Sequence, residues 1–442
     1  SRPPIPTSKV FVHQQRYAGV SAHDKLSALR SQLALRHADG MLVCALDDIA
    51  WLLNLRGQDV HCTPVFVGYV LVSVDAATLF VDKAKLTPEV EHYLADEGVG
   101  VAPYTAVADA LRHYNDYNLL LDPAEVNYTL WRAAAQQRVV RAASPVPAMK
   151  AVKNETEIEG FHHAMLRDGV AMVRFLKWLK PAVLAGGETE LSAAEKLRAL
   201  RAEQPLFRDL SFDTIAAYAA HGAIVHYEPT PESDAPLHPE GLLLLDSGAQ
   251  YLDGTTDITR TIALGPVTDE ERKVYTLVLK GHLQLQNLCF PDGACGSQLD
   301  AVARMAMWSE GMNFMHGTGH GVGSYLNVHE GPHQIRMEWR PAPLHAGMTV
   351  TDEPGLYLAD RFGVRIENTL LVAQHKKTEF GSFLRFEPLT LCPIDKTPIV
   401  PELLSADERA WLNAYHLLVY EALYAMLEPD EQKWLADACA PL

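Results

Sequence analysis

The chain has 442 residues, of which 48% are hydrophobic and 21% are charged. This is the composition of a soluble globular protein, and the length favours two domains over one core. A net charge of −17 argues against nucleic acid as a partner, because phosphate binding needs a basic surface. The apolar runs have the length of strands, so no membrane is expected as a partner. Six scattered cysteines without a Cys-x-x-Cys pair fit reduced thiols and favour a cytoplasmic location.

The first third of the chain predicts a small mixed α/β domain. Residues 1–20 are rich in proline and polar side chains and are interpreted as a linker or arm. From residue 21 to 147 helical and strand patterns alternate, with no Gly-rich phosphate loop and no clustered ligands. The expected elements are an amphipathic helix at 24–36, a buried strand at 40–46, a helix capped by Asp47-Asp48 and ending near 55, and strands at 65–73, 78–81 and 118–122.

A proline-rich break at 144–147 marks the expected boundary with a second domain at 148–442. This domain should open with a long helix over 155–180, which Asn154 and Glu157 are placed to cap. Strand signals dominate from 210 to 393, and helices return at 405–438. The chemical motifs all fall within the strand-rich stretch.

The first motif is a predicted β-hairpin that carries two aspartates. Two strand-like runs flank a turn at 250–254, and a hairpin folded about that centre places Asp246 opposite Asp257. Directly opposed side chains lie about 4.5–5.5 Å apart at Cβ. Two carboxylates at that distance repel each other unless a cation lies between them. Two surface acids on an exposed hairpin are the weaker interpretation, because Asp246 ends a run of four leucines.

A second predicted hairpin carries two glutamates. Glu353 ends one strand, Glu367 lies in the next, and residues 358–362 join the two strands. Alternation along the second strand puts Arg365 on the same face as Glu367. Either glutamate alone would be an ordinary surface acid, and only its pairing with the first hairpin points to a metal site.

A glycine-rich loop with two histidines, His316-Gly-Thr-Gly-His320-Gly-Val-Gly, lies between the two hairpins. A lone histidine is more often a satisfied core residue, but this setting favours His320 as a metal ligand. Four carboxylates with one imidazole carry a charge of −4, which two divalent cations would neutralise. Oxygen-rich ligation suits Mn²⁺ or a similar ion. Two metals about 3.5–4 Å apart can bridge a water and lower its pKa, which makes hydroxide available for hydrolysis.

The order Asp, Asp, His, Glu, Glu in these contexts resembles the pita-bread metallopeptidases, which include methionine aminopeptidase, prolidase and aminopeptidase P. The phrases Asp-Ser-Gly-Ala-Gln-Tyr at 246–251, His-Gly-Thr-Gly-His-Gly-Val-Gly at 316–323 and Thr-Asp-Glu-Pro-Gly-Leu-Tyr at 351–357 are most similar to cytosolic eukaryotic-type Xaa-Pro aminopeptidase. The likeness extends through residues 47–60 and 386–391 and covers most of the chain. It implies an α/β (α+β) fold, with a creatinase-like N-terminal domain before a pita-bread catalytic domain. The longest relatives carry a further first domain, and this chain begins where its linker would end.

The resemblance also implies roles for individual residues. The five metal ligands would be Asp246, Asp257, His320, Glu353 and Glu367, holding two Mn²⁺ ions, with Zn²⁺ or Co²⁺ as alternatives. The catalytic residues would be His226, His329, Glu353 and Arg365, with Glu353 accepting a proton from the bridging water. The substrate-binding residues would be His226, Ile224, His316 and His329. The implied reaction removes an N-terminal residue that precedes proline, from peptides bound by a homodimeric enzyme.

Two other functions remain open at this point. Xaa-Pro dipeptidase (prolidase) uses the same metal site but needs a cation for the substrate carboxylate, and Arg336 and Arg340 lie in the loop where prolidases place an arginine. Exposed loop charges are the favoured interpretation of these two residues. A non-catalytic pita-bread binding module is the remote alternative, because such modules lose ligands and all five are present here.

Overall fold

The computed structural model describes residues 4–442, so the first three residues of the predicted arm lie outside the described part. The chain divides into two compact units. Unit 1 holds residues 1–157 with 325–327, and unit 2 holds 158–324 with 328–442. The division falls inside a long helix that follows the predicted boundary at 144–147. Within residues 4–442, no helix combines the length and apolar composition of a membrane span.

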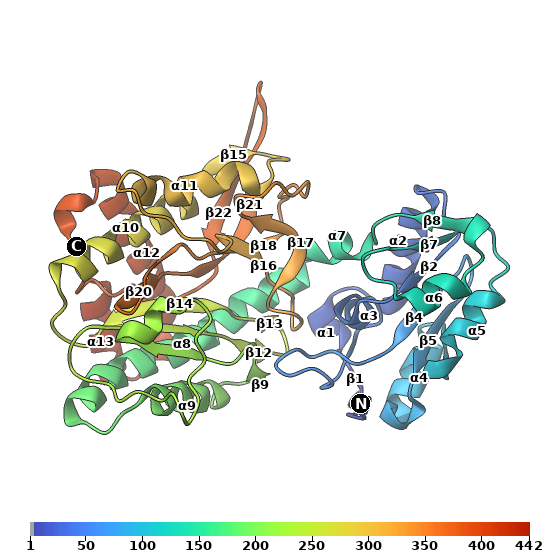
Figure 1. The fold of residues 1–442 in the computed structure, drawn as a ribbon, viewed down its shortest axis with the longest axis horizontal. Coiled ribbons are helices and arrows are strands. Elements are labelled where there is room, and N and C mark those ends of the chain that lie inside the picture. Colours follow the sequence, from blue (N-terminus) through green and yellow to red (C-terminus); the bar gives the residue numbers. More distant parts are fainter. Residues whose placement is uncertain (1–3) are drawn as a thin grey trace. The chain divides into compact units, whose positions relative to one another are not determined.

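Unit 1 is built on a mixed six-stranded sheet with the strand order β6-β5-β4-β2-β7-β8 (Figure 1). Its strands are β2 (Gly40–Val43), β4 (Tyr69–Val72), β5 (Ala77–Val81), β6 (Val99–Pro103), β7 (Leu119–Leu121) and β8 (Val139–Arg141). Its α-helices are α1 (Gln15–Ala18), α2 (Ala22–Ala34), α3 (Leu46–Leu52), α4 (Pro88–Asp96), α5 (Val107–Arg112), α6 (Tyr128–Ala133) and α7 (Val146–Ala151). The strands and helices expected from the sequence are therefore present, with shifts of a few residues at their ends.

Two details of unit 1 differ from the sequence-based expectation. Part of the predicted arm belongs to the fold, because β1 (Phe11–Val12) pairs antiparallel with β3 (Leu55–Arg56). Helix α3 is not capped by an aspartate side chain, since Ala45 occupies the N-cap position. Asp47 and Asp48 instead lie in the first turn, where both pair with the buried Lys150.

The long helix is α8 (Glu155–Ala185), most of which belongs to unit 2, and the predicted capping pair at its start is confirmed. The main-chain N–H of Asn154 donates to Glu157, and the N–H of Glu157 donates to the Asn154 side chain at 3.0 Å. The other α-helices are α9 (Glu190–Ala202), α10 (Asp269–Gln286), α11 (Gly296–Trp308), α12 (Ala406–Leu423) and α13 (Pro429–Cys439). The short strands outside the two hairpins are β9 (Phe207–Leu210), β10 (Ile215–Tyr218), β15 (Cys289–Pro291), β16 (Gly319–Gly321), β17 (Glu330–Ile335) and β22 (Gly381–Pro388).

The first predicted hairpin exists, but its register is not the expected one. Strand β11 (Leu242–Ser247) pairs with β14 (Ile258–Ala263), and the partner of Asp246 is Thr259. The prediction that Asp246 directly opposes Asp257 is therefore wrong. The cause lies at the tip, where β12 (Ala249–Tyr251) and β13 (Gly254–Thr255) close a tighter two-residue turn. A shift of two residues keeps both aspartates on one face, as diagonal rather than direct neighbours.

The second hairpin keeps its expected pairing. Strand β18 (Thr349–Asp352) pairs with β21 (Asn368–Thr378), and β19 (Gly355–Leu358) pairs with β20 (Phe362–Arg365). Both ladders have the same register, which continues across the short gap between them. Glu353 and Glu367 lie in that gap and are opposite each other.

Candidate metal centre

The two hairpins and the histidine loop meet at a cavity of about 460 Å³ in unit 2. Nine of the residues predicted from the sequence line it, namely His226, Asp246, Asp257, His316, His320, His329, Glu353, Arg365 and Glu367. Ile224 does not line the cavity, and its side chain is 55% exposed. Its neighbour Val225 lines the cavity instead, next to His226. Arg336 is a lining residue and Arg340 is not.

Three of these residues form a group that could hold a metal ion. The ligand atoms of Asp257, His320 and Glu367 all lie within 4.8 Å of one another. Glu353 is adjacent, with its Oε1 atom 3.4 Å from His320 Nε2, while Asp257 Oδ2 lies 3.5 Å from the same nitrogen. The imidazole therefore reaches between carboxylates that come from both hairpins.

The carboxylates are buried close together, and this changes their proton affinity. Burial and the charges of Asp246 and Glu353 raise the pKa of Asp257 well above its ordinary value. Burial and the charge of Asp257 likewise raise the pKa of Glu367 well above its ordinary value. Burial raises the pKa of Glu353 to about 8, although Arg365 opposes the shift. Without cations this group of acids would hold protons near neutral pH.

Neighbouring polar groups fix the orientation of the acids and of the imidazole. Thr259 donates its hydroxyl to Glu367 Oε2 at 2.7 Å, and Thr351 donates to Glu353 at 3.2 Å. His320 Nδ1 lies 2.8 Å from the carbonyl oxygen of Gly321, which can only accept. The proton of this ring is therefore on Nδ1, and Nε2 presents a lone pair to the carboxylates. Burial lowers the pKa of His320 to about 3, so the ring is neutral.

Arg365 connects the acids to a tyrosine that the sequence had not singled out. Its guanidinium donates to Asp246 Oδ2 at 2.6 Å and to the Tyr357 hydroxyl at 2.7 Å. Tyr357 in turn donates to His316 Nε2 at 2.8 Å, because His316 Nδ1 is committed to the Gly317 carbonyl oxygen. Burial lowers the pKa of His316 to about 4. In this structure the polar ring atoms of His316 are therefore used within the protein.

The other two predicted histidines also line the cavity. The ring of His329 meets that of His320 edge-on, with centroids 4.2 Å apart. Burial lowers the pKa of His329, which favours the neutral ring. His226 is exposed and follows the short helix η4 (Ala219–Ala223).

A buried glutamate, which no sequence motif had singled out, anchors the loop that carries His226. Glu190, at the start of α9, has no exposed surface. Its carboxylate accepts hydrogen bonds from the Tyr218 main-chain N–H at 2.7 Å and from the Tyr227 hydroxyl at 2.8 Å. His221 Nδ1 lies 2.9 Å from the same carboxylate, and its ring stacks on Tyr227. Tyr218 precedes η4, His221 lies within it and Tyr227 follows it. Glu190 therefore holds the segment that carries His226 and Val225 to the cavity.

Comparisons with known proteins agree with this geometry. Residues 159–374 match metallopeptidase family M24, residues 1–157 match the creatinase/prolidase N-terminal domain, and residues 382–442 match the C-terminal region of the M24 peptidases. The chain is 42% identical to the probable Xaa-Pro aminopeptidase P of Laccaria bicolor and 41% identical to Xaa-Pro aminopeptidase 1 of Dictyostelium discoideum. All of this chain is covered in both cases, with 71% and 72% of the relatives.

Solved structures show the same relationship. The X-prolyl aminopeptidase of Caenorhabditis elegans, described as a cytosolic enzyme with a di-nuclear active site, matches with a TM-score of 0.95 at 36% identity. The match covers all of this chain and 74% of that one. The Xaa-Pro dipeptidase of Bacillus anthracis has a TM-score of 0.68 at 24% identity, over 85% of this chain and 99% of that one. This second likeness supports the fold alone.

Proposed function

The chain belongs to metallopeptidase family M24, and we propose that it is a metal-dependent exopeptidase that releases the N-terminal residue from peptides with proline in second position. The observation that carries this proposal is the convergence of four carboxylates and a neutral imidazole in one cavity. Similarity to Xaa-Pro aminopeptidases over the whole chain supplies the substrate class.

Two divalent metal ions fit the residues of this cavity. The proposed ligands are Asp246, Asp257, His320, Glu353 and Glu367. The buried Oδ1 atom of Asp246 has no hydrogen-bond partner among the described residues, as expected of an oxygen that awaits a cation. Oxygen-rich donors with a single nitrogen favour Mn²⁺, with Zn²⁺ or Co²⁺ as the alternatives. When bound, such ions supply Lewis acidity and lower the pKa of water.

The protein's own groups would then complete the chemistry. Glu353 is placed to take the proton of the attacking water, because its carboxylate lies at the cavity and is oriented by Thr351. His329 lines the same cavity and is placed to donate a hydrogen bond to the oxygen on which negative charge develops. Arg365 would hold Asp246 in position through its two hydrogen bonds to one carboxylate oxygen.

The cavity wall offers a surface for the substrate's proline. Phe212, Ile215 and Val225 are its apolar lining residues, next to His226. A proline ring lacks an N–H and has a fixed φ, so a small apolar wall suits it without a hydrogen-bond acceptor. The free amine of the substrate would face the acidic ligands, which favour a cation.

One observation keeps Xaa-Pro dipeptidase as a second candidate. Arg336 lines the cavity and could meet a substrate carboxylate. Its guanidinium is already 2.7 Å from the Glu338 carboxylate and also donates to Gln334. Because the Glu338 carboxylate already offsets this positive charge, we favour the aminopeptidase.

Turnover of an Xaa-Pro dipeptide should be compared with that of an Xaa-Pro-Yaa-Zaa peptide in the presence of Mn²⁺. The proposal expects cleavage of the longer peptide between its first residue and proline. Cleavage confined to the dipeptide would establish the prolidase alternative. Absence of cleavage of either peptide by metal-loaded protein would favour a non-catalytic binding module.

We also propose that the protein is a cytoplasmic homodimer. Met305, Trp308 and Met315 are large apolar side chains with 54%, 44% and 81% of their surface exposed, close together along the chain at the end of α11 and the loop after it. Such side chains commonly mark a protein interface. Six free cysteines fit a reducing compartment. The molar mass from light scattering, measured for Trp308→Glu and for the unaltered protein, tests this proposal. We expect a dimer for the unaltered protein and a monomer for the variant.

A further inference from the structure

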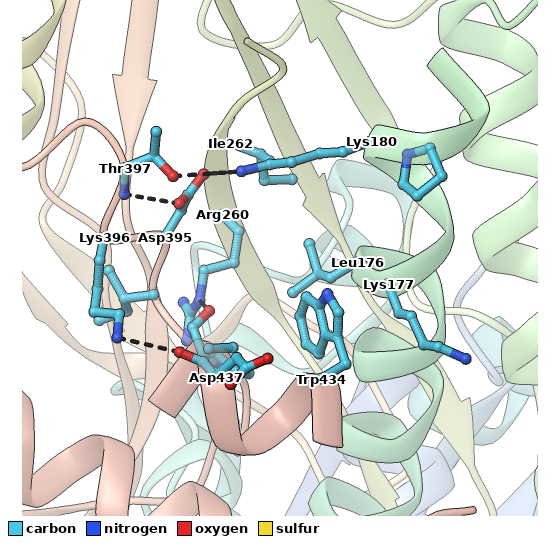
Figure 2. Close-up of a pocket in the computed structure, with 14 residues that line it drawn as sticks. Leu176, Lys177, Lys180, Arg260, Ile262, Asp395, Lys396, Thr397, Trp434 and Asp437 are labelled. Atoms are coloured by element: carbon cyan, nitrogen blue, oxygen red, sulfur yellow. Dashed lines mark hydrogen bonds and ion pairs between the residues drawn. The ribbon is translucent and has the colours of Figure 1, made fainter. Parts of the chain in front are cut away.

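A second cavity in unit 2, also about 460 Å³ in volume, lies behind strand β14 (Figure 2). Side chains alternate between the two faces of a strand. Thr259 and Thr261 of β14 contact Glu367 and Arg365 at the candidate metal centre. Arg260 and Ile262, which alternate with them, line the second cavity instead. This cavity is therefore separate from the metal centre.

The second cavity has an apolar interior. Its walls come from α8, β14, the segment 393–397 and α13. The apolar lining residues are Leu176, Pro181, Ile262, Pro393, Ile394, Trp434 and Ala438. Figure 2 shows the indole of Trp434, a lining residue, beside Leu176. The interior can accept the apolar body of a small molecule, and an aromatic one would stack on the indole.

The charges around this apolar interior are mainly positive. The lining holds four cations, Lys177, Lys180, Arg260 and Lys396, and two carboxylates, Asp395 and Asp437. This excess of positive charge occurs in a chain with a net charge of −17. The local positive potential of such a lining attracts anions, although the protein as a whole is acidic.

Arg260 is the most telling of these cations, because it is buried without an acidic partner. Its side chain is 1% exposed. Its hydrogen-bond acceptors among the described residues are neutral: the carbonyl oxygens of Pro393, Thr259, Glu367 and Cys392, the Asn368 amide and the Tyr415 hydroxyl. Among the described residues, no carboxylate forms an ion pair with it. A buried charge is usually paired, so an anion in the adjoining cavity would supply the missing counter-charge.

The lysines at the rim differ in how far they are already neutralised. Lys177 pairs with Asp430 and points away from the cavity in Figure 2, and Lys180 lies 3.1 Å from Asp395. Lys396 donates to the main-chain oxygens of Asp437 and Ala440 and forms no ion pair among the described residues. The Asp437 carboxylate belongs to an exposed residue at the rim. Lys396 is therefore the rim cation with the most charge left for a ligand.

We propose that this cavity binds an amphipathic carboxylate, with its apolar body between Ile262, Ile394 and Trp434. The carboxylate group lies at Lys396, and Lys180 and Arg260 add to the positive field around it. The proposal is independent of the hydrolytic function, because none of these residues lines the metal cavity.

Isothermal titration calorimetry of the metal-loaded protein with 2-naphthoate, and with the neutral 2-naphthamide, tests this proposal. The acid should bind, and the amide should bind at least about tenfold more weakly because it lacks the charge. Absence of binding up to about 5 mM acid, or equal affinity for acid and amide, would overturn the proposal.

Three variants locate the bound acid. Ala438→Trp should abolish binding by filling the cavity, and Lys396→Met should weaken it by about tenfold. Lys433→Met removes an exposed lysine of α13 outside the cavity and should leave the affinity unchanged. Unfolding midpoints show which variants fold. If Lys396→Met does not fold, Lys180→Met replaces it. Binding that survives Ala438→Trp would place the acid elsewhere, such as at the metals, and contradict the proposal.

Discussion

The two faces of strand β14 border cavities of equal size and opposite charge. In front, Asp246, Asp257, Glu353 and Glu367 line the cavity together, with Arg365 and Arg336 as the lining cations. Behind, Arg260 is buried among neutral acceptors, with lysines around it. Volume does not distinguish the two cavities. The cavities differ in the charge that the protein leaves unpaired, which is negative at the metal centre and positive at Arg260. This difference predicts bound cations in the first cavity and a bound anion in the second.

The largest effect is expected from removing a carboxylate in the front cavity. Asp257→Ala deletes one of the three clustered ligands, so metal and activity should be lost together. Because metal catalysis supplies several kcal/mol of transition-state stabilisation, we expect turnover to fall by about a thousandfold or more. Metal analysis beside peptide hydrolysis measures both. A variant that binds no metal and keeps its activity would contradict the charge argument.

A smaller loss is expected from a residue that lines the front cavity without holding metal. His329→Ala should retain the ions but lower kcat by about a hundredfold, the usual consequence of removing one donor to a developing oxyanion. The same two measurements apply. Loss of metal in this variant would instead show that His329 is a metal ligand, and the set of five proposed ligands would have to be revised.

Glu190 offers a test of the wall behind His226. Glu190→Ala removes the acceptor of three hydrogen-bond donors around η4, and we expect kcat/KM to fall by about tenfold with metal content unchanged. Glu195→Ala is the matched control, because Glu195 lies on the same helix with its side chain 62% exposed. If kcat/KM is unchanged in both variants, Glu190 has no positioning role.

The pH dependence of stability should differ between the metal-free and the metal-loaded protein. Folding raises the pKa of Glu353 from its ordinary 4.5 to about 8. The stability that this group contributes is complete below about pH 4.5 and is lost as the pH rises through about 8. Asp257 and Glu367 shift in the same direction. The melting temperature of EDTA-treated protein should therefore fall by roughly 5 °C or more from pH 5 to 8.

Bound cations remove the cause of that decline, since they compensate the charges of the acids. The melting temperature of the metal-loaded protein should be nearly constant over the same range. Calorimetric scans at several pH values measure both curves. If the melting temperatures of the two forms changed with pH in parallel, the buried acids would not be the cause of the decline in the metal-free protein.

The residue types of the candidate site were predictable from sequence, but their exact placement was not. Nine predicted residues line the cavity, because glycine loops and paired acids leave a local signature and the family resemblance added His226 and His329. The register of Asp246 was two residues off, because the tip closes at Leu252–Asp253 rather than one residue earlier. Ile224 was assigned in place of Val225, since a loop has no periodicity from which its facing can be read.

Residues that act through long-range contacts gave no sequence signal. Glu190 lies 37 positions from Tyr227, to which it is hydrogen-bonded. Tyr357 lies within a motif phrase, yet its link to His316 depends on a fold that joins positions 41 residues apart. Arg260 looked like an ordinary strand residue, and only the fold shows that it is buried without a carboxylate partner.

The central claim is that the front cavity holds two divalent ions and uses them to hydrolyse peptides. Its most direct test is a titration of metal-free protein with Mn²⁺, in which bound metal per chain and hydrolysis of an Xaa-Pro-Yaa-Zaa peptide are followed together. The account predicts that activity reaches its plateau only when two ions are bound per chain. A plateau at one ion, with the second site empty at full activity, would contradict it.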